Sequence, residues 1–482
     1  MTCLRVIFIF LLIQAGRLAA DGECYLVVAG RLASAEGCVL MGHNEDNGTD
    51  KLFRFIRVER SAHGPGDFIE LEGRGRIEQA DTTWAYIVCE MPGLDFSHAL
   101  LNEFSVAVVS DNCPSREDRP EIVQGGIGPR LRWLVAERAK TAREGVKLVG
   151  ALVEKFGYSA SGRTLTIGDP AEAWQVALVN GRHWVARRVP DDQVAVLANS
   201  FGIHEVDLAD TLDFLGSPDL VDYAQARGWY DPNTDGGFDF ERAYARQDLV
   251  NDPNQRLRQW TGYRHLAGGT FPVPEEGKPL PFSIRPAQPV TRQHLYALLR
   301  DHYEGTPYEA AWGRAHDTPA GYCPRTVCHG STNHGDVFEL KGDGRGAGTV
   351  WWTALWRPCA SPFVPIFLKM DGVPQELYFE VDKPVYANPG SGVMPGREKA
   401  IGVFRDLTLS LDAGGWAGMK EMRSVWEKWE RGADRRVNRF AGRSGSTSGR
   451  RLYELSEALL REAMNQASSY LERNQANAAD GR

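Results

Sequence analysis

The chain has 482 residues, of which 43% are hydrophobic, 10% aromatic and 24% charged, and this composition excludes an intrinsically disordered or low-complexity protein. A chain of this length forms two or three small domains or one large layered domain. The formal net charge is −8, and no block of basic residues is interleaved with aromatic residues, so we expect no nucleic-acid-binding surface.

The first twenty residues have the pattern of a secretory signal peptide. Arg5 precedes an apolar run at 6–16, and Leu18-Ala19-Ala20 provides the small residues of a cleavage site. The apolar run is too short to span a membrane, and no later segment has eighteen consecutive apolar residues. We therefore expect a mature protein that is secreted, or periplasmic or lumenal, and that is not inserted in a membrane.

The body of the chain starts with strands. Short alternating hydrophobic runs, separated by Gly, Pro, Asp and Asn, fill residues 24–110 and predict strands and turns. Between 127 and 156 the apolar residues recur with a helical period, and Thr141 and Glu144 have the spacing of a capping box. We expect two helices that meet near Thr141, the second of which ends at Gly157.

A second group of strands precedes a long loop-rich region. Residues 164–197 contain the further strands, and residues 215–330 are rich in Asp, Pro and Gly, which predicts long loops with short helices. The last strong strand pattern is 349–352, and the predicted C-terminal helices are 416–430 and 452–473. Strands, two helices and strands again favour a layered α+β body over a doubly wound parallel sheet.

The number of cysteines and the position of Cys24 indicate that Cys24 is a reactive thiol. The chain has eight cysteines, and loss of Cys3 with the signal peptide leaves seven, an odd number that indicates one unpaired thiol in an oxidising compartment. Removal of residues 21–23 would give Cys24 both a thiol and a free α-amino group. These groups have ordinary pKa values of about 8.5 and about 7.7–8.0, which suit a nucleophile and a general base. A disulfide-bonded cysteine near the mature N-terminus is the alternative.

Several short segments between about residue 24 and residue 370 form a recognisable series. They are Cys24-Tyr-Leu-Val-Val-Ala-Gly30, Gly42-His43-Asn44-Glu45-Asp46, Ser110-Asp111-Asn112-Cys113-Pro114, Ser161-Gly-Arg-Thr164, Ile167-Gly-Asp-Pro-Ala-Glu-Ala-Trp174, Ala198-Asn199 and Ser331-Thr332-Asn333-His334. In this order they resemble the dipeptidase and secernin family of cysteine N-terminal-nucleophile hydrolases, relatives of the choloylglycine hydrolases. The resemblance implies an α+β fold: a four-layer αββα sandwich with long loop insertions and a helical C-terminal segment.

The predicted organisation of the chain has four parts. A signal peptide occupies 1–20 and a short propeptide 21–23. The N-terminal-nucleophile hydrolase domain occupies 24–400, and a helical C-terminal extension occupies 401–482.

The resemblance also implies an active site. Cys24 is the nucleophile, exposed at the N-terminus when its own thiol cuts away residues 21–23. Asp46 matches the acidic residue that holds the α-amino group, since a carboxylate orients an amine. Asn112 and Asn199 match the amides that stabilise the tetrahedral oxyanion. Ordinary turn positions are the structural alternatives for Asp46 and for both asparagines.

Three further positions are less clear in their match to the family. His43 stands where close relatives have an arginine beside the nucleophile, and an imidazole is charged only at lower pH. We expect His43 to be a catalytic residue whose charge assists Cys24 over a limited pH interval around neutrality; the alternative is that it only packs near the strand end. Arg256 and Arg258 lie where relatives have substrate-binding arginines, and a solvated loop is the alternative for both.

Two patterns resemble metal sites. Cys323, Cys328, His329 and His334 provide ligands suited to tetrahedral zinc, but disulfide bonding of the two cysteines is favoured in an exported protein. The segment 231–241 begins like a calcium loop and lacks the bidentate glutamate at the twelfth position, so a turn-rich loop is favoured. We expect no metal and no cofactor.

These observations together predict an exported cysteine dipeptidase. We expect it to bind a small peptide substrate and to bind neither nucleic acid nor a membrane. The sequence leaves open whether the protein forms a homo-oligomer. Two alternatives remain: an amidase for another small N-acyl substrate on the same scaffold, and a non-catalytic binding protein that kept the fold.

Overall fold

In the computed structural model of the protein, the described residues are 23–48, 51–92, 96–250, 252–269, 271–275, 278–309, 325–342, 347–380, 395–441 and 448–479. The predicted signal peptide, residues 21–22 of the predicted propeptide and Cys323 lie outside the described residues.

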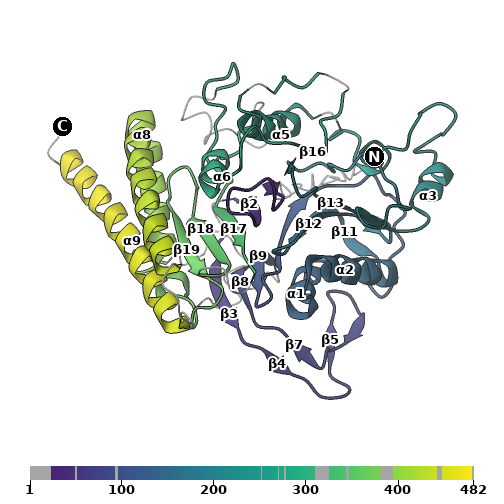
Figure 1. The fold of residues 1–482 in the computed structure, drawn as a ribbon, viewed down its shortest axis with the longest axis horizontal. Coiled ribbons are helices and arrows are strands. Elements are labelled where there is room, and N and C mark those ends of the chain that lie inside the picture. The colour runs from purple at the N-terminus through teal and green to yellow at the C-terminus, as the bar shows by residue number, and fades with distance from the viewer. Residues whose placement is uncertain are drawn as a thin grey trace, which may run out of the picture.

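Two antiparallel sheets form the centre of the molecule (Figure 1). The seven-stranded sheet has the order β16 (Ser283–Ile284), β14 (Val194–Leu197), β1 (Glu23–Ala29), β2 (Val39–Asp46), β17 (His334–Leu340), β18 (Val350–Leu355) and β19 (Phe363–Phe367). The eight-stranded sheet has the order β15 (Phe214–Gly216), β13 (Trp184–Arg188), β12 (Ala173–Gly181), β11 (Tyr158–Gly168), β10 (Ala107–Asn112), β9 (Phe96–Asn102), β8 (Tyr86–Met91) and β3 (Arg54–Val58). Two small separate sheets pair β4 (Ser61–Ala62) with β7 (Thr82–Thr83) and β5 (Phe68–Glu70) with β6 (Arg76–Glu78).

Helices cover the outer faces of both sheets, so the layers follow the order αββα (Figure 1). α1 (Arg130–Arg138) and α2 (Ala142–Phe156) pack on the eight-stranded sheet, where their apolar side chains join those of β11 and β12 in one buried cluster. α5 (Pro253–Leu266) and α6 (Arg292–Leu299) pack on the seven-stranded sheet. A second, larger apolar cluster includes the side chains that lie between the sheets. The predicted α+β sandwich is confirmed.

The boundary between α1 and α2 follows from the sequence. Thr141 Oγ1 accepts a hydrogen bond from the backbone N–H of Glu144 (3.1 Å), and the Glu144 carboxylate accepts one from the N–H of Lys140 (2.8 Å). The first of these bonds satisfies an amide group that the first turn of a helix leaves unpaired, and the second holds the residue before the N-cap. At the other end, Gly157 has a φ of 77°, which costs glycine little. The two predicted helices are confirmed.

The loop-rich region contains one substantial helix that the composition did not indicate. Asp252 caps α5 by accepting a hydrogen bond from the N–H of Asn254 (2.7 Å), and Pro253 stands in the first turn, where its missing amide hydrogen costs nothing. The apolar residues of α5 are not confined to one face, so the helical period is weak. The other described helices of this region, α3 (Leu220–Ala226), α4 (Phe240–Tyr244) and α6 (Arg292–Leu299), are short as predicted.

The last strong strand pattern of the sequence, 349–352, overlaps β18, and a further strand, β19, follows it. Pro365 lies in the middle of β19, and proline lowers the strand propensity of a segment since it cannot donate a backbone hydrogen bond. The place of β19 at the edge of the sheet is where a strand tolerates proline.

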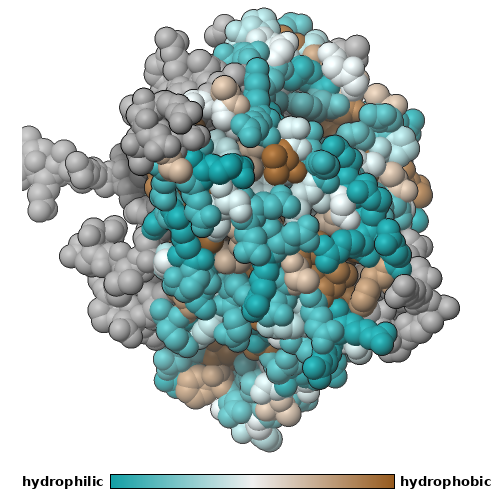
Figure 2. Space-filling model, turned by 90° about the vertical axis from the view of Figure 1, so that its left-hand side faces the viewer, coloured by the Kyte–Doolittle hydropathy of each residue, from teal (hydrophilic) through white to brown (hydrophobic). Residues whose placement is uncertain are grey.

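Two long helices, α8 (Ala400–Ala441) and α9 (Gly449–Ala479), lie beside β18 and β19 (Figure 1). α8 is interrupted at Gly415, which has a φ of 73°. Buried ion pairs join α8 to both ends of α6: Glu430 with Arg300 (2.6 Å) and Asp434 with Arg292 (3.0 Å). The face on this side of the molecule is mainly hydrophilic, with scattered apolar residues (Figure 2). None of the described helices combines the length and apolarity needed to cross a membrane.

Candidate active site

Cys24 lies at the start of a central strand. It is the second residue of β1, which is hydrogen-bonded to β14 on one side and to β2 on the other. Glu45 of β2 is its partner in the strand register, and Glu23 is paired with Asp46. Only 1% of Cys24 is exposed. The thiol is therefore enclosed by the residues at the ends of the neighbouring strands.

Asn199, which follows β14, holds the backbone nitrogen of Cys24. The Cys24 N–H donates to Asn199 Oδ1 (2.9 Å), and Asn199 Nδ2 donates to the backbone oxygen of Asn112 (3.0 Å). The φ of Asn199 is 48°, a left-handed conformation that asparagine adopts more readily than most residues. These bonds join the end of β14 in one sheet to the end of β10 in the other. Three predicted site residues thus meet in the structure.

Asp46, the last residue of β2, is surrounded by donors. Arg258 Nη2 donates to its Oδ2 (2.9 Å), His329 Nε2 lies 3.0 Å from the same oxygen, and the Thr332 hydroxyl donates to Oδ1. The side chains of Asp46 and Arg258 have no solvent-accessible surface. The carboxylate is therefore part of the buried site and not of an Asx turn.

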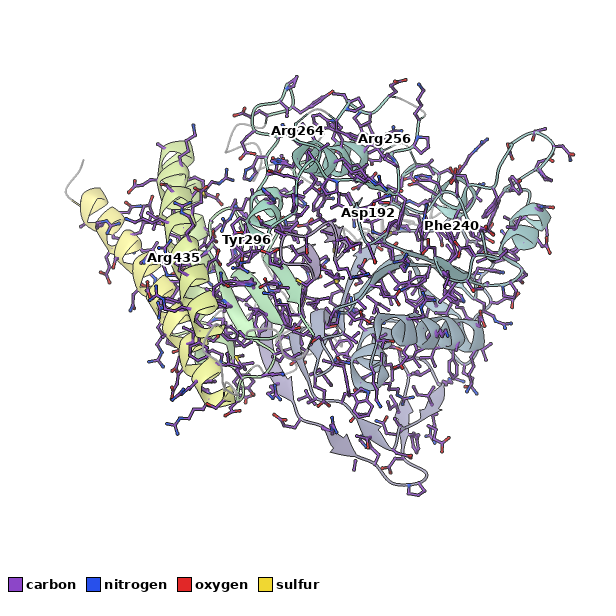
Figure 3. The ribbon with its side chains drawn as sticks, viewed as in Figure 1. Asp192, Phe240, Arg256, Arg264, Tyr296 and Arg435 are labelled. Atoms are coloured by element: carbon purple, nitrogen blue, oxygen red, sulfur yellow. The ribbon has the colours of Figure 1, made fainter. Side chains whose placement is uncertain are left out.

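The two predicted arginines of α5 have different surroundings. Arg258 also donates to the backbone oxygen of Cys24 (2.9 Å) and to Asn199 Oδ1 (2.9 Å). Arg256 lies two residues earlier, and residues two apart point to different sides of a helix. It donates to the backbone oxygen of Glu275 (2.8 Å), and Figure 3 shows its label, like that of Arg264, toward the outer edge of the molecule by α5. The structure brings Arg258 into the site and leaves Arg256 outside it.

The Cys24 thiol is neutral in this structure. Burial, followed by the charges of Glu45, Asp111 and Asp46, raises the pKa of the thiol well above its usual range, while Arg163 opposes this effect. The Cys24 Sγ donates to Glu45 Oε1 (3.3 Å), and burial raises the pKa of Glu45 to about 8. The sequence assigned no role to Glu45. A carboxyl group that titrates near neutrality therefore lies within reach of the thiol proton.

Residues 23–388 match the profile of peptidase family C69. The chain belongs to peptidase family C69. The match begins at the strand that carries Cys24 and ends before α8, and it confirms the family that the sequence segments resemble. The protein is therefore an enzyme, a peptidase.

Relatives of this C69 peptidase include dipeptidases. A dipeptidase from Bifidobacterium longum is 26% identical over 402 residues, which cover 73% of this chain and 72% of that protein. A probable dipeptidase from Salmonella dublin is 24% identical over 358 residues, which cover 72% of this chain and 81% of that protein. Among solved structures, penicillin V acylase from Agrobacterium tumefaciens aligns with a TM-score of 0.37 and 13% identity over 72% of this chain and 87% of that chain.

His43 of the C69 peptidase lies beside the nucleophile but is not charged near neutrality. Its ring is fully buried, and ligand atoms of His43, Cys24 and Asp111 lie within 4.8 Å of one another. Burial lowers the pKa of His43 to about 4, although the charge of Asp46 acts in the opposite direction. The expectation that a protonated imidazole assists Cys24 around neutral pH is therefore wrong.

Two arginines, one in the eight-stranded sheet and one in the helix layer that covers it, place positive charge near Cys24. Arg163 of β11 lowers the pKa of Cys24, and its Nη1 donates to Ser110 Oγ (3.1 Å). Arg132 of α1 is 1% exposed and donates to the same hydroxyl. Both guanidinium groups also lower the pKa of Glu45. Arg163 belongs to a segment that resembles the family, but only the pairing of β10 with β11 places it near Cys24.

The described residues of the two metal-like patterns do not gather into the sites that the sequence suggests. His329 contacts Asp46, His334 lies between the sheets, and Cys328 lies near His302 and Cys359. Cys328 forms no disulfide with another described residue. In the segment 231–241, the acidic side chains accept hydrogen bonds from nearby backbone amides and pair with Arg242 and His204. This segment is a turn-rich loop followed by α4.

Proposed function

We propose that this C69 peptidase is an exported dipeptidase in which Cys24 is the nucleophile and its own α-amino group, once released, is the general base. The observation that carries the proposal is the set of contacts on the backbone of Cys24: Asn199 holds its nitrogen, and Arg258 holds its oxygen while it pairs with Asp46. An amine released at this nitrogen would be fixed beside its own thiol. The names of the relatives support dipeptides as the substrate class.

Processing starts from a chain in which the Cys24 nitrogen is still in a peptide bond with Glu23. The Cys24 sulfur adds to the carbonyl carbon of Glu23 while the thiol proton passes to Glu45, whose Oε1 lies 3.3 Å away. The bond between this carbon and the Cys24 nitrogen then breaks, and the nitrogen takes up a proton. Water hydrolyses the resulting thioester and releases the segment that ends at Glu23. An amide nitrogen is no base, so the precursor needs a base such as Glu45.

In the mature enzyme the α-amino group takes over as the base, because an α-amine has an ordinary pKa of about 7.7–8.0. It accepts the thiol proton as the sulfur attacks the carbonyl carbon of the dipeptide, and it then protonates the leaving amine. Water releases the remaining amino acid from the acyl-enzyme. Arg258 acts as a positioning residue, since its contacts are with Asp46, Asn199 and the backbone of Cys24.

The oxyanion of the tetrahedral intermediate is assigned to the amides of Asn112 and Asn199. One such donor lowers the barrier by about 3 kcal/mol. Asn199 Nδ2 donates to the Asn112 backbone oxygen in the unprocessed fold, so donation to an oxyanion exchanges that bond for a stronger, charge-assisted one.

Export is part of the proposal and is supported by the pattern of the first twenty residues. Expression with and without residues 1–20 tests it: the full chain is expected outside the cytoplasm and the shortened chain inside. Equal distribution of both chains would contradict export and would leave the catalytic proposal untouched.

The catalytic proposal is tested by hydrolysis of a panel of free dipeptides, N-acyl amino acids and bile-salt-like conjugates. We expect turnover of free dipeptides, and we expect Cys24→Ala to lose at least about 10³-fold in kcat/KM. Cys38→Ala is the matched control, because Cys38, just before β2, is equally buried but lies outside the site. Turnover of N-acyl amino acids alone would show that these compounds, and not dipeptides, are the substrates. An active Cys24→Ala enzyme would contradict the assignment of Cys24 as the nucleophile.

A further inference from the structure

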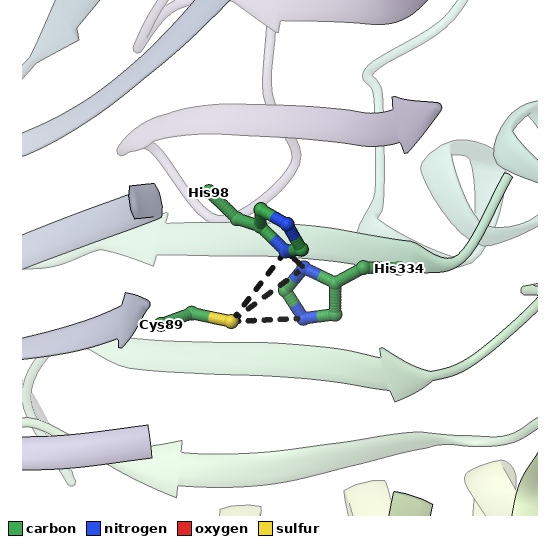
Figure 4. A group of neighbouring side chains, drawn as sticks. All are labelled: Cys89, His98 and His334. Atoms are coloured by element: carbon green, nitrogen blue, oxygen red, sulfur yellow. Dashed lines mark hydrogen bonds between the residues drawn. The ribbon is translucent and has the colours of Figure 1, made fainter. Parts of the chain in front are cut away.

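A cluster of three metal-binding side chains lies between the two sheets, and the reaction proposed above does not use it. The inter-sheet cluster consists of Cys89 of β8, His98 of β9 and His334 of β17, all with no exposed surface. Figure 4 shows that the sulfur and the two imidazole rings converge. Cys89 Sγ lies 3.7 Å from His98 Nδ1 and 3.9 Å from His334 Nδ1, and the two Nδ1 atoms are 3.3 Å apart.

A β-bulge places His98 in the cluster. On β9, Ala99 and Leu101 belong to the apolar cluster that includes the inter-sheet residues, and Leu100 belongs to the cluster under α1 and α2. Strict alternation would give His98 the same direction as Leu100. The register shifts at this point, because Cys89 pairs with Ala99 and the next residue of β8 pairs with the residue before His98. Bulges of this kind redirect a side chain, and here the bulge lets the imidazole reach Cys89.

The ring of His334 is oriented by hydrogen-bond partners at Nε2, an atom that lies 3.9 Å from Cys89 Sγ, as Nδ1 does. Its Nε2 lies 2.7 Å from Thr353 Oγ1 and 3.2 Å from Asp336 Oδ1. A carboxylate or hydroxyl acceptor at Nε2 keeps the proton there and leaves the lone pair on Nδ1, the arrangement that metal-bound histidines show.

The distances within the inter-sheet cluster match those between ligands of one ion. Tetrahedral zinc with Zn–N bonds of about 2.0–2.1 Å and Zn–S bonds of about 2.3 Å separates two nitrogens by about 3.3 Å and nitrogen from sulfur by about 3.6 Å. The observed separations are 3.3 Å for the nitrogens and 3.7 and 3.9 Å for sulfur and nitrogen. An ion fits here with shifts of a few tenths of an ångström.

Asp336, which lies 3.2 Å from His334 Nε2, is itself held in place. It is fully buried, and its Oδ1 accepts a hydrogen bond from Trp351 Nε1 (2.6 Å). The group that orients the His334 ring is therefore fixed in turn.

We propose that Cys89, His98 and His334 bind a transition-metal ion that accepts thiolate and imidazole ligands, and that this ion joins the two sheets. Zn²⁺ and copper ions share this ligand chemistry. The ligands come from strands of both sheets, so the ion would connect them; three protein ligands leave the fourth position of a tetrahedral ion to water. The proposal departs from the sequence expectation of no metal, and it does not depend on the proposed reaction. Binding releases the thiol proton of Cys89.

The test is the metal content of the full-length enzyme, because an enclosed site takes up its ion during folding. Protein is produced in medium supplemented with Zn²⁺ or with Cu²⁺, dialysed against a chelator and analysed by mass spectrometry of the metals. We expect about one tightly held ion per chain, with sulfur and two nitrogens as ligands in X-ray absorption spectra. A colourless zinc protein and a copper protein with a thiolate charge-transfer band distinguish the two ions, and either result supports the site.

Variants show whether these residues hold the ion. Cys89→Ser and His98→Gln are expected to lose most of the bound metal, and Cys38→Ser, a buried cysteine outside the cluster, is expected to keep it. Wild-type protein refolded with Zn²⁺ is expected to have a higher Tm than protein refolded with a chelator. Wild-type protein with less than a tenth of an equivalent of metal would overturn the proposal even if the variants fail to fold, and so would equal metal content in wild type and both cluster variants.

Discussion

The carboxylate of Asp46 and the guanidinium of Arg258 form an ion pair of 2.9 Å in which neither side chain reaches solvent. Such a pair is compensated only if the remaining hydrogen-bonding groups are also satisfied. Here Thr332 and His329 contact the carboxylate, and Asn199 and the Cys24 backbone accept from the guanidinium. The ion pair thus links the end of β2, α5 and the nucleophile in one network.

Breaking this ion pair is expected to destabilise the fold. Asp46→Asn leaves Arg258 buried without its counter-charge, and the loss in the free energy of unfolding should be about 3–5 kcal/mol. Arg256→Met, two residues away on the outer side of α5, is the control and should change the free energy of unfolding by no more than about 0.5 kcal/mol. Urea unfolding measures both. Equal, small effects would show that the pair is not buried as described.

Processing is expected to depend on the ionised form of Glu45. The pKa of Glu45 is about 8, so the fraction that can accept the thiol proton rises as pH increases through this value. Cleavage after Glu23 should therefore accelerate between pH 6 and pH 9, and Glu45→Gln, which keeps an acceptor but not a base, should slow it at least about tenfold. Precursor produced as a denatured chain and refolded at each pH allows the rate to be followed by mass. A pH-independent rate in wild type would exclude Glu45 as the base.

His43 is expected to influence stability in acid and not the activity profile near neutrality. Its pKa in the folded state, about 4, lies below its ordinary value of 6.5, so folding favours the neutral ring. The stability from this preference is present above about pH 6.5 and is lost as pH falls toward 4. His43→Gln should flatten this loss of stability, while kcat/KM between pH 6 and pH 9 should keep the shape of the wild-type profile. If the alkaline limb of the kcat/KM profile shifts in the variant, His43 has the electrostatic role that the sequence predicts.

The ion pair of Arg300 with Glu430 is expected to hold α8 on the body of the enzyme. Both side chains are about 5% exposed, and the carboxylate also accepts a hydrogen bond from the backbone N–H of Phe363 (2.9 Å). Glu430→Gln should lower the free energy of unfolding by about 3–5 kcal/mol. Glu462→Gln removes an exposed pair between α9 and α8 and should cost less than about 1 kcal/mol. Similar costs for the two variants would contradict this anchoring.

The sequence predicts those parts of the site that lie in continuous motifs. Cys24, Asp46 and Asn199 each stand in a short segment with a family-like neighbourhood, and the structure brings them together. The sequence indicates both Arg256 and Arg258 as substrate-binding residues. It does not show which of them reaches the site, because that distinction requires knowing that Asp252 and Pro253 start a helix.

The remaining features depend on tertiary structure. Arg163 reaches Cys24 only through the pairing of β10 with β11, and His98 joins Cys89 only through a bulge that no spacing in the sequence indicates. The neutral state of His43 follows from burial between two sheets, which lowers its pKa and which composition cannot predict. These properties arise where residues distant in sequence share one enclosed space.

The intact mass of the active enzyme decides whether the Cys24 α-amine is the base. Enzyme with full dipeptidase activity is expected to begin at Cys24, and Cys24→Ala is expected to carry Glu23 and the residues before it. Fully active enzyme that begins at Asp21 would contradict the account, because its Cys24 nitrogen would remain in a peptide bond and could not act as the base.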